Sequence, residues 1–526
     1  MGPETAEAPS PADAGTSRAA ALILSPWLIL GIVLAASFAL YAPILDDWFQ
    51  TDDFFLLRAA NTVPFPTYVR EAFDFRDFEP LRFFAYRPLF FVTNDIMYHA
   101  FGLNALPYHL VSIVLHVVNV ALVWQIARRT TNSTLIAHVA AAVFGLHPVY
   151  ATTVAWISTQ NSIMATTGQL FAAVAFLEFM RRGSKRWLGL SLAAYGAAIL
   201  YHQEVFLLPA ALGTYYLLTR LDKPREALRS AVFIFAPFAV ILGVFLAIQG
   251  WNSNQSGFIG GFTPGLHLVK THAGVLGMSV FPKFSALSTD LMPAGSSSPG
   301  FEWTHALGAS IALGAAVTIF WLRRERRAVI VFALVWYHGS LLLSELFLGS
   351  GEPVPLLARK IYAAGPAFAL LVAIAAETAW LYLQPRLTPS VKPAIYSTAA
   401  MVAVLAITVT FIHAGDIRDE IEPLAIDSHD FITDLRAEHP TLPENGTLYV
   451  AQAPFALQLF CAPEIDFCYL TDAISLYYEG VQVERIPTQQ ARDQEFIDGL
   501  GPNDRLFCWR CAPAAPKPPG GASAGD

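Results

Sequence analysis

The chain has 526 residues, of which 55% are hydrophobic and 14% are charged, and its mean hydropathy is +0.46. A soluble domain cannot bury so large an apolar share, so the composition predicts an integral membrane protein. The formal net charge is −8, and no stretch combines dense Lys and Arg with aromatic side chains, which argues against nucleic acid as a partner.

The chain begins with a polar stretch that is followed by a long apolar one. Residues 1–20 are rich in Pro, Ala, Ser and Glu, so we expect a disordered cytoplasmic tail. Residues 21–42 are apolar over a length that spans a bilayer. That length exceeds the apolar core of a cleaved signal peptide. We therefore interpret residues 21–42 as an uncleaved first membrane helix.

Further apolar windows of spanning length bring the expected number of membrane helices to about eleven. They fall at 106–127, 134–150, 162–180, 187–201, 203–219, 230–249, 303–322, 328–347, 361–381 and 395–414. Basic residues gather between alternate pairs of windows, at 128–129, 181–186, 220–229, 323–327 and 386–392. Because short basic loops stay in the cytoplasm, this alternation predicts a cytoplasmic N-terminus and, with an odd number of helices, an external C-terminus.

The predicted topology places four segments outside: 44–105, 250–302, 348–360 and everything after about 415. Arg outnumbers Lys, which is typical of a GC-rich bacterial source, so we expect the inner (plasma) membrane and a periplasmic C-terminus. Strand-like runs at 446–452, 480–486 and 505–509 alternate with helical patterns. The expected fold is an all-α polytopic membrane domain over 21–414, a small extracytoplasmic α/β domain over 415–511, and a disordered tail over 512–526.

All four cysteines lie in the predicted outer domain: Cys461, Cys468, Cys508 and Cys511. An oxidising compartment permits disulfides, and four cysteines allow three pairings. The Cys-x6-Cys and Cys-x2-Cys spacings also fit zinc, and free thiols are a third alternative. We favour disulfides, because the topology and the cysteine positions agree independently.

The first outer segment opens with four aspartates directly after the first membrane helix: Asp46, Asp47, Asp52 and Asp53. Crowding of like charges raises the pKa of at least one carboxyl, which makes this group a candidate general base or metal ligand. The alternative is that the acids simply end a helix that faces water. The repetition of the pair favours a function.

The window 106–127 carries four polar residues at spacings of three, four and three, so they share one helix face: His109, Ser112, His116 and Asn119. Polar side chains within a bilayer usually hydrogen-bond to a neighbouring helix. We therefore favour a structural role for this polar stripe over a catalytic one.

Further titratable groups fall at the outer ends of later windows. His147 follows the window 134–150, and His202 and Glu204 lie where two windows meet. An acid at a membrane boundary is costly without a partner, so Glu204 is the best second acid, and with Asp53 it is a candidate ligand pair for a divalent metal. Arg359 and Lys360 precede the window 361–381 and could hold a phosphate. The alternative is that these two cations only flank a helix.

Taken in order, these motifs resemble the C-type, polyprenyl-phosphate-sugar-dependent glycosyltransferases. Within them the chain is similar to the protein O-mannosyltransferase-like branch that includes the transmembrane and tetratricopeptide-repeat mannosyltransferases. The resemblance covers roughly residues 22–380. Its most specific parts are Tyr86-Arg87-Pro88-Leu89, Phe101-Gly102-Leu103-Asn104, Tyr108-His109-Leu110, Leu115-His116 and Asn119, followed by the Asp-Asp pair, Leu146-His147-Pro148-Val149, Gln203-Glu204, and Arg359 with Tyr362.

The resemblance implies transfer of a sugar, mannose by default, from a polyprenyl-phosphate donor to an extracytoplasmic protein or glycolipid acceptor. It places the catalytic carboxylate at Asp52 or Asp53, and we expect this pair close to Glu204 and to the cations Arg359 and Lys360. A divalent metal is a further expectation. The resemblance assigns the donor phosphate and lipid to Arg87, Arg359, Lys360 and Tyr362, and acceptor or supporting contacts to His147, His202, Glu204, His109 and His116.

The sequence departs from the family pattern at several positions. Thr152, Gln160 and Ser162 stand where the family has acids and an Arg, and Gln203 replaces the Lys before the Glu. No tetratricopeptide-type repeat follows the membrane part. One alternative is therefore an inactive family member that acts as an assembly partner. A transporter or flippase of lipid-linked sugars is another, although a transporter is expected to have repeated halves with paired helix breaks.

Overall fold

The computed structural model describes residues 25–76, 86–256, 266–280, 303–347, 361–386, 388, 390–458 and 468–511. The chain divides into two compact units. The first unit holds residues 1–45, 69–93 and 106–420, and the second holds 46–68, 94–105 and 421–526.

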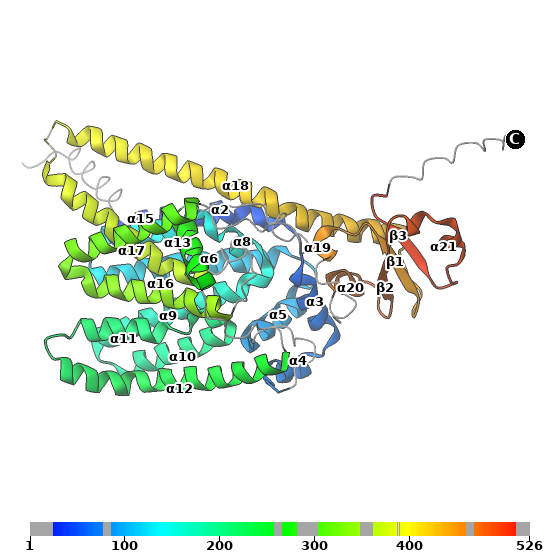
Figure 1. Ribbon diagram of the computed structural model, residues 1–526, viewed down its shortest axis with the longest axis horizontal. Helices are drawn as coiled ribbons and strands as arrows, with labels where there is room; N and C mark the ends of the chain where they lie inside the picture. The colour runs from blue at the N-terminus through cyan, green and yellow to red at the C-terminus, as the bar shows by residue number, and fades with distance from the viewer. Residues whose placement is uncertain are drawn as a thin grey trace, which may run out of the picture. The chain divides into compact units, whose positions relative to one another are not determined.

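The first unit is built from helices that pack side by side (Figure 1). At its centre α6 packs against α7 and α9, and α7 packs against α17. Its helices are α2 (Pro26–Tyr41), α6 (Leu106–Thr131), α7 (Thr134–Gly145), α8 (Ala151–Ala155), α9 (Gln160–Arg182), α10 (Lys185–Tyr201), α11 (Leu208–Leu218), α12 (Pro224–Ser256), α13 (Leu266–Val280), α15 (Trp303–Leu322), α16 (Arg327–Phe347) and α17 (Ile361–Leu383). Three further helices have residues in both units: α4 (Phe65–Phe73), α5 (Pro88–Phe101) and α18 (Lys392–Glu438).

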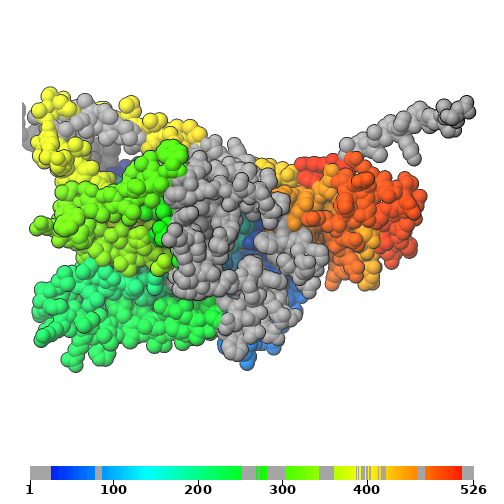
Figure 2. Space-filling model, viewed as in Figure 1, coloured from blue at the N-terminus to red at the C-terminus, as the bar shows by residue number. Residues whose placement is uncertain are grey.

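The apolar windows predicted from the sequence all contain helix, which confirms a multi-pass, all-α membrane domain. Within the described ranges six helices are long and apolar enough to cross a membrane, or seven if a bent pair counts as one span. The total of about eleven spans stays a prediction. The helix α12 lies at the surface, green in Figure 2, and exposes Val232, Phe233 and Val240, as expected for a face in contact with lipid.

The window 134–150 is broken, although the sequence predicted one continuous helix. The helix α7 ends at Gly145, and the chain turns by 44° before the segment Pro148–Ala155. Pro148 lacks the N–H that a continuing helix would use. A Cβ at Gly145 would collide with the side chains of Ser37 and Val120, so glycine permits the close packing of α7 on α2 and α6.

Ion pairs fasten the ends of the helices next to the basic loops. The carboxylate of Glu377 on α17 lies 2.7 Å from an Arg323 Nη2 and 3.5 Å from an Arg326 Nη2. It also accepts a 2.6 Å hydrogen bond from Ser133, whose hydroxyl in turn caps α7 at the Ile136 N–H. These contacts join α7, α17 and the loop that follows α15.

The second unit contains a small parallel sheet in the order β2–β1–β3. Leu448 on the central strand pairs with Val483 on one side and with Arg505 on the other. Leu448 and Val450 are fully buried, as expected for the middle strand of a parallel sheet. The elements are α3 (Asp52–Thr62), β1 (Thr447–Ala451), α19 (Phe455–Gln458), α20 (Tyr469–Ser475), β2 (Gln482–Arg485), α21 (Gln494–Asp498) and β3 (Arg505–Cys508). A small C-terminal α/β domain is thereby confirmed.

A disulfide between Cys508 and Cys511 closes the end of β3. The Arg510 guanidinium between these cysteines lies 2.8 Å from Asp427 and 3.1 Å from Asp430, both on α18. The disulfide expectation is confirmed for this pair, which does not bind zinc as thiolates. Cys461 lies outside the described residues, so the remaining pairing stays a prediction.

Candidate functional site

The acidic segment that the sequence singled out lies in the second unit, at the start of α3. Asp46 is exposed, Asp47 and Asp52 are half-buried, and Asp53 is 1% exposed. Thr51 precedes the helix with φ 46° and ψ −120°, a conformation that a residue with a Cβ rarely adopts. Asp52 and Asp53 occupy the first turn of α3, where the helix dipole favours negative charge.

The two aspartates of the second pair have different surroundings. Asp53 Oδ2 accepts a 3.0 Å hydrogen bond from the Gln50 backbone N–H, and the Asp53 N–H donates to the Gln50 carbonyl, also at 3.0 Å. Asp53 therefore fixes the turn that leads into α3. Asp52 Oδ1 instead accepts a hydrogen bond from the Tyr469 hydroxyl. Of the two residues, Asp52 is the more exposed.

Tyr469 opens α20, which packs against α3 (Figure 1). One turn further along α20, Asp472 Oδ1 lies 2.6 Å from Arg58 Nη1 on α3, and Asp472 is 1% exposed. Burial raises the pKa of the Asp472 carboxyl to about 6, while the Arg58 charge opposes this rise. Sequence reasoning missed Tyr469, Asp472 and Arg58, because no local pattern relates residues more than 400 positions apart.

A second polar cluster lies in the first unit, where α5 begins and where α10 ends. The Arg87 Nε donates to the Gln203 side-chain oxygen over 3.3 Å. Gln203 stands at the position where the family pattern has Lys, so this position still has a cation next to it.

Glu204 belongs to the same polar cluster and is 2% exposed. Its Oε2 accepts a 3.2 Å hydrogen bond from Ser162 and lies 3.6 Å from His202 Nδ1. That nitrogen also accepts from the Glu204 backbone N–H over 3.3 Å, so it is the unprotonated nitrogen of the neutral ring. His202 and Glu204 thus lie on either side of Gln203 in the sequence, and Arg87, from a distant part of the chain, contacts Gln203.

The polar stripe of α6 is buried, and most of its hydrogen bonds join helices. His116 Nδ1 lies 2.9 Å from the Tyr362 hydroxyl on α17, and His116 Nε2 lies 3.2 Å from the Gly145 carbonyl. Asn119 donates to the same hydroxyl over 3.1 Å. Ser112 is bonded to Gln160 at 2.8 Å. These contacts agree with the structural interpretation of the stripe, and they place Tyr362 inside the helix packing.

His109 is 1% exposed within the same stripe. Its supporting role stays a prediction.

Arg359 and Lys360, which were expected to hold phosphate, lie outside the described residues. Asp52 and Asp53 belong to the second unit and Glu204 to the first, so the expected proximity of these acids also stays a prediction.

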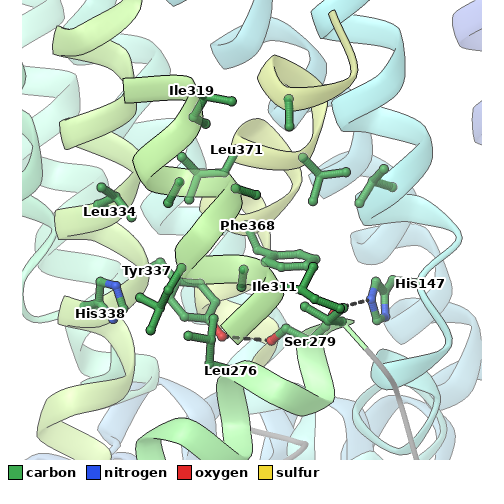
Figure 3. A pocket seen from close by; sticks show the side chains of 18 residues that line it. His147, Leu276, Ser279, Ile311, Ile319, Leu334, Tyr337, His338, Phe368 and Leu371 are labelled. Atoms are coloured by element: carbon green, nitrogen blue, oxygen red, sulfur yellow. Dashed lines mark hydrogen bonds between the residues drawn. The ribbon is translucent and has the colours of Figure 1, made fainter. Parts of the chain in front are cut away.

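An apolar cavity of about 380 Å³ lies between α7, α13, α15, α16 and α17 in the first unit (Figure 3). Its walls are almost entirely aliphatic and aromatic, with Ile319 and Leu371 toward one end. The polar groups gather at the other end, where the Tyr337 hydroxyl lies 2.8 Å from Ser279 Oγ. His147 also lines this polar end.

The ring of His147 has a defined orientation. Nδ1 accepts from the Val149 N–H over 3.2 Å, so Nε2 carries the proton and donates to the Ser279 carbonyl over 2.9 Å. His147 therefore links the break after α7 to the end of α13, next to the cavity. Its supporting role toward an acceptor stays a prediction.

A metal site was a further expectation from the sequence. Among the described residues no three His, Cys, Asp or Glu side chains lie together in a way that could hold a metal ion. The expected pair of metal ligands, Asp53 and Glu204, belongs to two different units and stays a prediction.

Comparison with known proteins agrees with this architecture. Residues 87–251 match the family model described as dolichyl-phosphate-mannose-protein mannosyltransferase. This stretch includes the Arg87 cluster, the polar stripe and His147. The match confirms the predicted resemblance to C-type, polyprenyl-phosphate-sugar-dependent glycosyltransferases. A search of curated proteins gave no match.

Solved structures resemble the chain in fold at low sequence identity. The apo oligosaccharyltransferase of Archaeoglobus fulgidus matches with a TM-score of 0.50 and 14% identity, over 87% of this chain and 64% of the archaeal chain. The archaeal oligosaccharyltransferase AglB from Archaeoglobus fulgidus, in complex with an inhibitory peptide and a dolichol-phosphate, matches with a TM-score of 0.50 and 14% identity, over 81% of this chain and 62% of the AglB chain. ArnT from Cupriavidus metallidurans bound to undecaprenyl phosphate gives a TM-score of 0.46 and 14% identity, over 82% of this chain and 84% of the ArnT chain. The chain spans less than two thirds of the length of the archaeal enzyme.

Proposed function

We propose that this protein is a membrane glycosyltransferase that transfers a sugar, by default mannose, from a polyprenyl-phosphate donor to a hydroxyl group of an extracytoplasmic protein or glycolipid. The observation that carries this proposal is the match of residues 87–251 to the mannosyltransferase family. The archaeal enzyme of similar fold has been solved with a dolichol-phosphate, which supports a polyprenyl carrier for this chain.

Asp52 is the general base in the proposed reaction. It is the half-buried member of the second aspartate pair, whereas Asp53 is 1% exposed and bonded to the backbone at Gln50. The Asp52 carboxylate takes the proton of the acceptor hydroxyl while the acceptor oxygen attacks the anomeric carbon. The bond between that carbon and the phosphate oxygen breaks, and polyprenyl phosphate leaves with the bonding electrons.

Arg87 stabilises the phosphate in this proposal. A guanidinium has several donors at fixed geometry and matches phosphate oxygens in pairs. The Lys of the family pattern is missing at Gln203, but Arg87 lies 3.3 Å from the Gln203 amide. This contact favours an active enzyme over the inactive alternative, because a cation remains beside the substituted position.

The apolar cavity beside His147 takes part of the isoprenoid chain of the donor in this proposal. Its lining residues include Leu276, Ile311, Leu334 and Phe368, and its few polar groups gather at one end. An isoprenoid chain offers only apolar surface, so this lining suits it. The N-terminus lies in the cytoplasm in this proposal, and the second unit with its Cys508–Cys511 disulfide lies outside the cell membrane.

The proposal is tested in cells of the source organism that carry the wild-type gene, a deletion, or the Asp52→Asn variant. Intact masses of extracytoplasmic proteins and extracted glycolipids are compared among the three. We expect hexose-sized mass additions with the wild type that are missing from the deletion and from Asp52→Asn. Identical masses in all three strains would contradict the proposal, and the class of molecule that changes identifies the acceptor.

A further inference from the structure

We infer that Tyr469 of the C-terminal domain is a positioning residue for Asp52, so that α20 completes the candidate catalytic centre at the start of α3. This inference rests on the proposed function for its catalytic meaning. Its structural part concerns the ionisation and orientation of one carboxyl and can be measured without any substrate.

The Tyr469 hydroxyl is in the right place to orient Asp52. It donates a hydrogen bond to Asp52 Oδ1, and the Tyr469 ring is 2% exposed, so its packing leaves it little freedom. One Asp52 oxygen is thereby occupied and the carboxylate plane is fixed. A base with a fixed plane meets a bound hydroxyl in one orientation, which is what proton abstraction needs.

A buried ion pair holds Tyr469 in this position. Asp472, three residues after Tyr469 on α20, lies 2.6 Å from the guanidinium of Arg58, which projects from α3. Asp52 and Arg58 belong to the same helix, so the two contacts fasten α20 to α3 at two points. Breaking the ion pair loosens α20 and moves the hydroxyl away from Asp52.

The charged groups around Tyr469 explain why its proton stays on oxygen. Burial raises the pKa of the Tyr469 hydroxyl, and Asp52, Asp472 and Asp53 raise it further in that order. Elsewhere along α3, Tyr98 of α5 donates to Asn61. A protonated phenol can only donate to a carboxylate, so the contact favours the ionised, proton-accepting form of Asp52.

The direct test measures how readily the Asp52 carboxyl takes up a proton. Full-length protein in detergent is treated with a water-soluble diazoacetamide, which esterifies carboxyl groups in their protonated form, and the ester at Asp52 is quantified by peptide mass spectrometry between pH 3 and pH 8. In Tyr469→Phe the labelling at Asp52 should extend to higher pH than in the wild type, by about one pH unit for the loss of one hydrogen bond to a charged group.

Tyr478→Phe is the matched control. Tyr478 belongs to the same domain, and its hydroxyl donates to the His439 carbonyl over 2.6 Å. This variant loses the same atom, and Asp52 should be labelled as in the wild type. An unchanged labelling profile at Asp52 in Tyr469→Phe, or an equal shift in Tyr478→Phe, would overturn the inference.

Arg58→Gln keeps the inference testable if Tyr469→Phe fails to fold. Arg58 is half-exposed, so the substitution leaves the packing of α3 largely intact. The Asp52 labelling should shift in the same direction by a smaller amount, and an unshifted profile in this variant would also overturn the inference.

Transfer activity separates this inference from the proposed function. If Asp52→Asn is as active as the wild type, the proposed function fails regardless of Tyr469. If Asp52→Asn is inactive while Tyr469→Phe has the wild-type pH–activity profile, only the positioning role fails. If the proposed function and the positioning role are both correct, the acidic limb of the pH–activity profile lies at higher pH in Tyr469→Phe than in the wild type, because Asp52 is ionised over a narrower pH range.

Discussion

The backbone N–H of Gln50 donates to the carboxylate of Asp53 over 3.0 Å, and the Asp53 N–H returns a hydrogen bond to the Gln50 carbonyl. This reciprocal pair closes the turn that places Asp52 at the first position of α3. The two adjacent aspartates therefore differ in role: Asp53 hydrogen-bonds to the backbone of the turn, whereas Asp52 is the candidate general base.

Substitution of these two residues should separate stability from activity. Asp53→Ala removes an acceptor that satisfies a backbone N–H near a helix start and should lower the free energy of unfolding by about 1–2 kcal/mol. Asp53→Asn keeps an acceptor oxygen and should lower it less. Asp52→Asn should leave the thermal midpoint close to that of the wild type. Thermal unfolding of purified protein checks this order, and equal destabilisation by Asp52→Asn and Asp53→Ala would contradict it.

Arg87→Gln should weaken binding of the donor phosphate. Loss of a charged hydrogen bond to phosphate costs about 1.5–3 kcal/mol, so the affinity for polyprenyl phosphate should fall roughly 10- to 100-fold. Microscale thermophoresis with polyprenyl phosphate checks this, and Arg70→Gln on the exposed face of α4 is the control. Equal affinities of Arg87→Gln and Arg70→Gln would exclude a phosphate role for Arg87.

Filling the apolar cavity should discriminate between donors by chain length. Ala316 of α15 lines the cavity, whereas its neighbour Val317 is 57% exposed and does not. Ala316→Phe should raise the KM for a long-chain polyprenyl-phosphate sugar and leave the KM for a short-chain analogue unchanged, because only the long chain needs the cavity. Val317→Phe should change neither. A rise for both donors in Ala316→Phe would indicate general disruption instead.

Asp472 should make stability depend on pH. Burial raises the pKa of its carboxyl from 3.8 to about 6, so the folded state binds this proton more tightly than the unfolded state does. Ionisation of the Asp472 carboxyl therefore lowers the free energy of unfolding progressively as the pH rises from 3.8 to about 6. Above that range the whole loss is present, on the order of 3 kcal/mol at most. The midpoint of thermal unfolding of Asp472→Asn, relative to that of the wild type, should rise over this pH range. A difference that is constant from pH 4 to pH 7 would contradict the expectation.

The sequence predicted those features that depend on local composition. Apolar length located the helices, and the β-branched and aromatic run around Leu448 to Val450 located the central strand. The spacing of His109, Ser112, His116 and Asn119 predicted one shared face, and all four are buried. In each case the physical signal lies within one element.

Other features depend on contacts that no local pattern encodes. The close packing of Gly145, just before the break, against Ser37 and Val120 involves residues that come from other helices. The contact of Tyr469 with Asp52 joins residues 417 positions apart. Nothing in the segment Tyr469–Ser475 distinguishes it from any short amphipathic helix, so its place beside the aspartates could not be read from the sequence.

The most direct test of the account uses purified protein in lipid nanodiscs with radiolabelled polyprenyl-phosphate mannose and hydroxyl-bearing acceptors, a Ser/Thr peptide and a glycolipid extract in separate reactions. We expect label in one acceptor and release of polyprenyl phosphate, with a rate that falls about 100- to 10,000-fold in Asp52→Asn. Transfer by Asp52→Asn at the wild-type rate would contradict the role of Asp52. The absence of transfer and of donor turnover with the wild-type protein would contradict the enzymatic function itself.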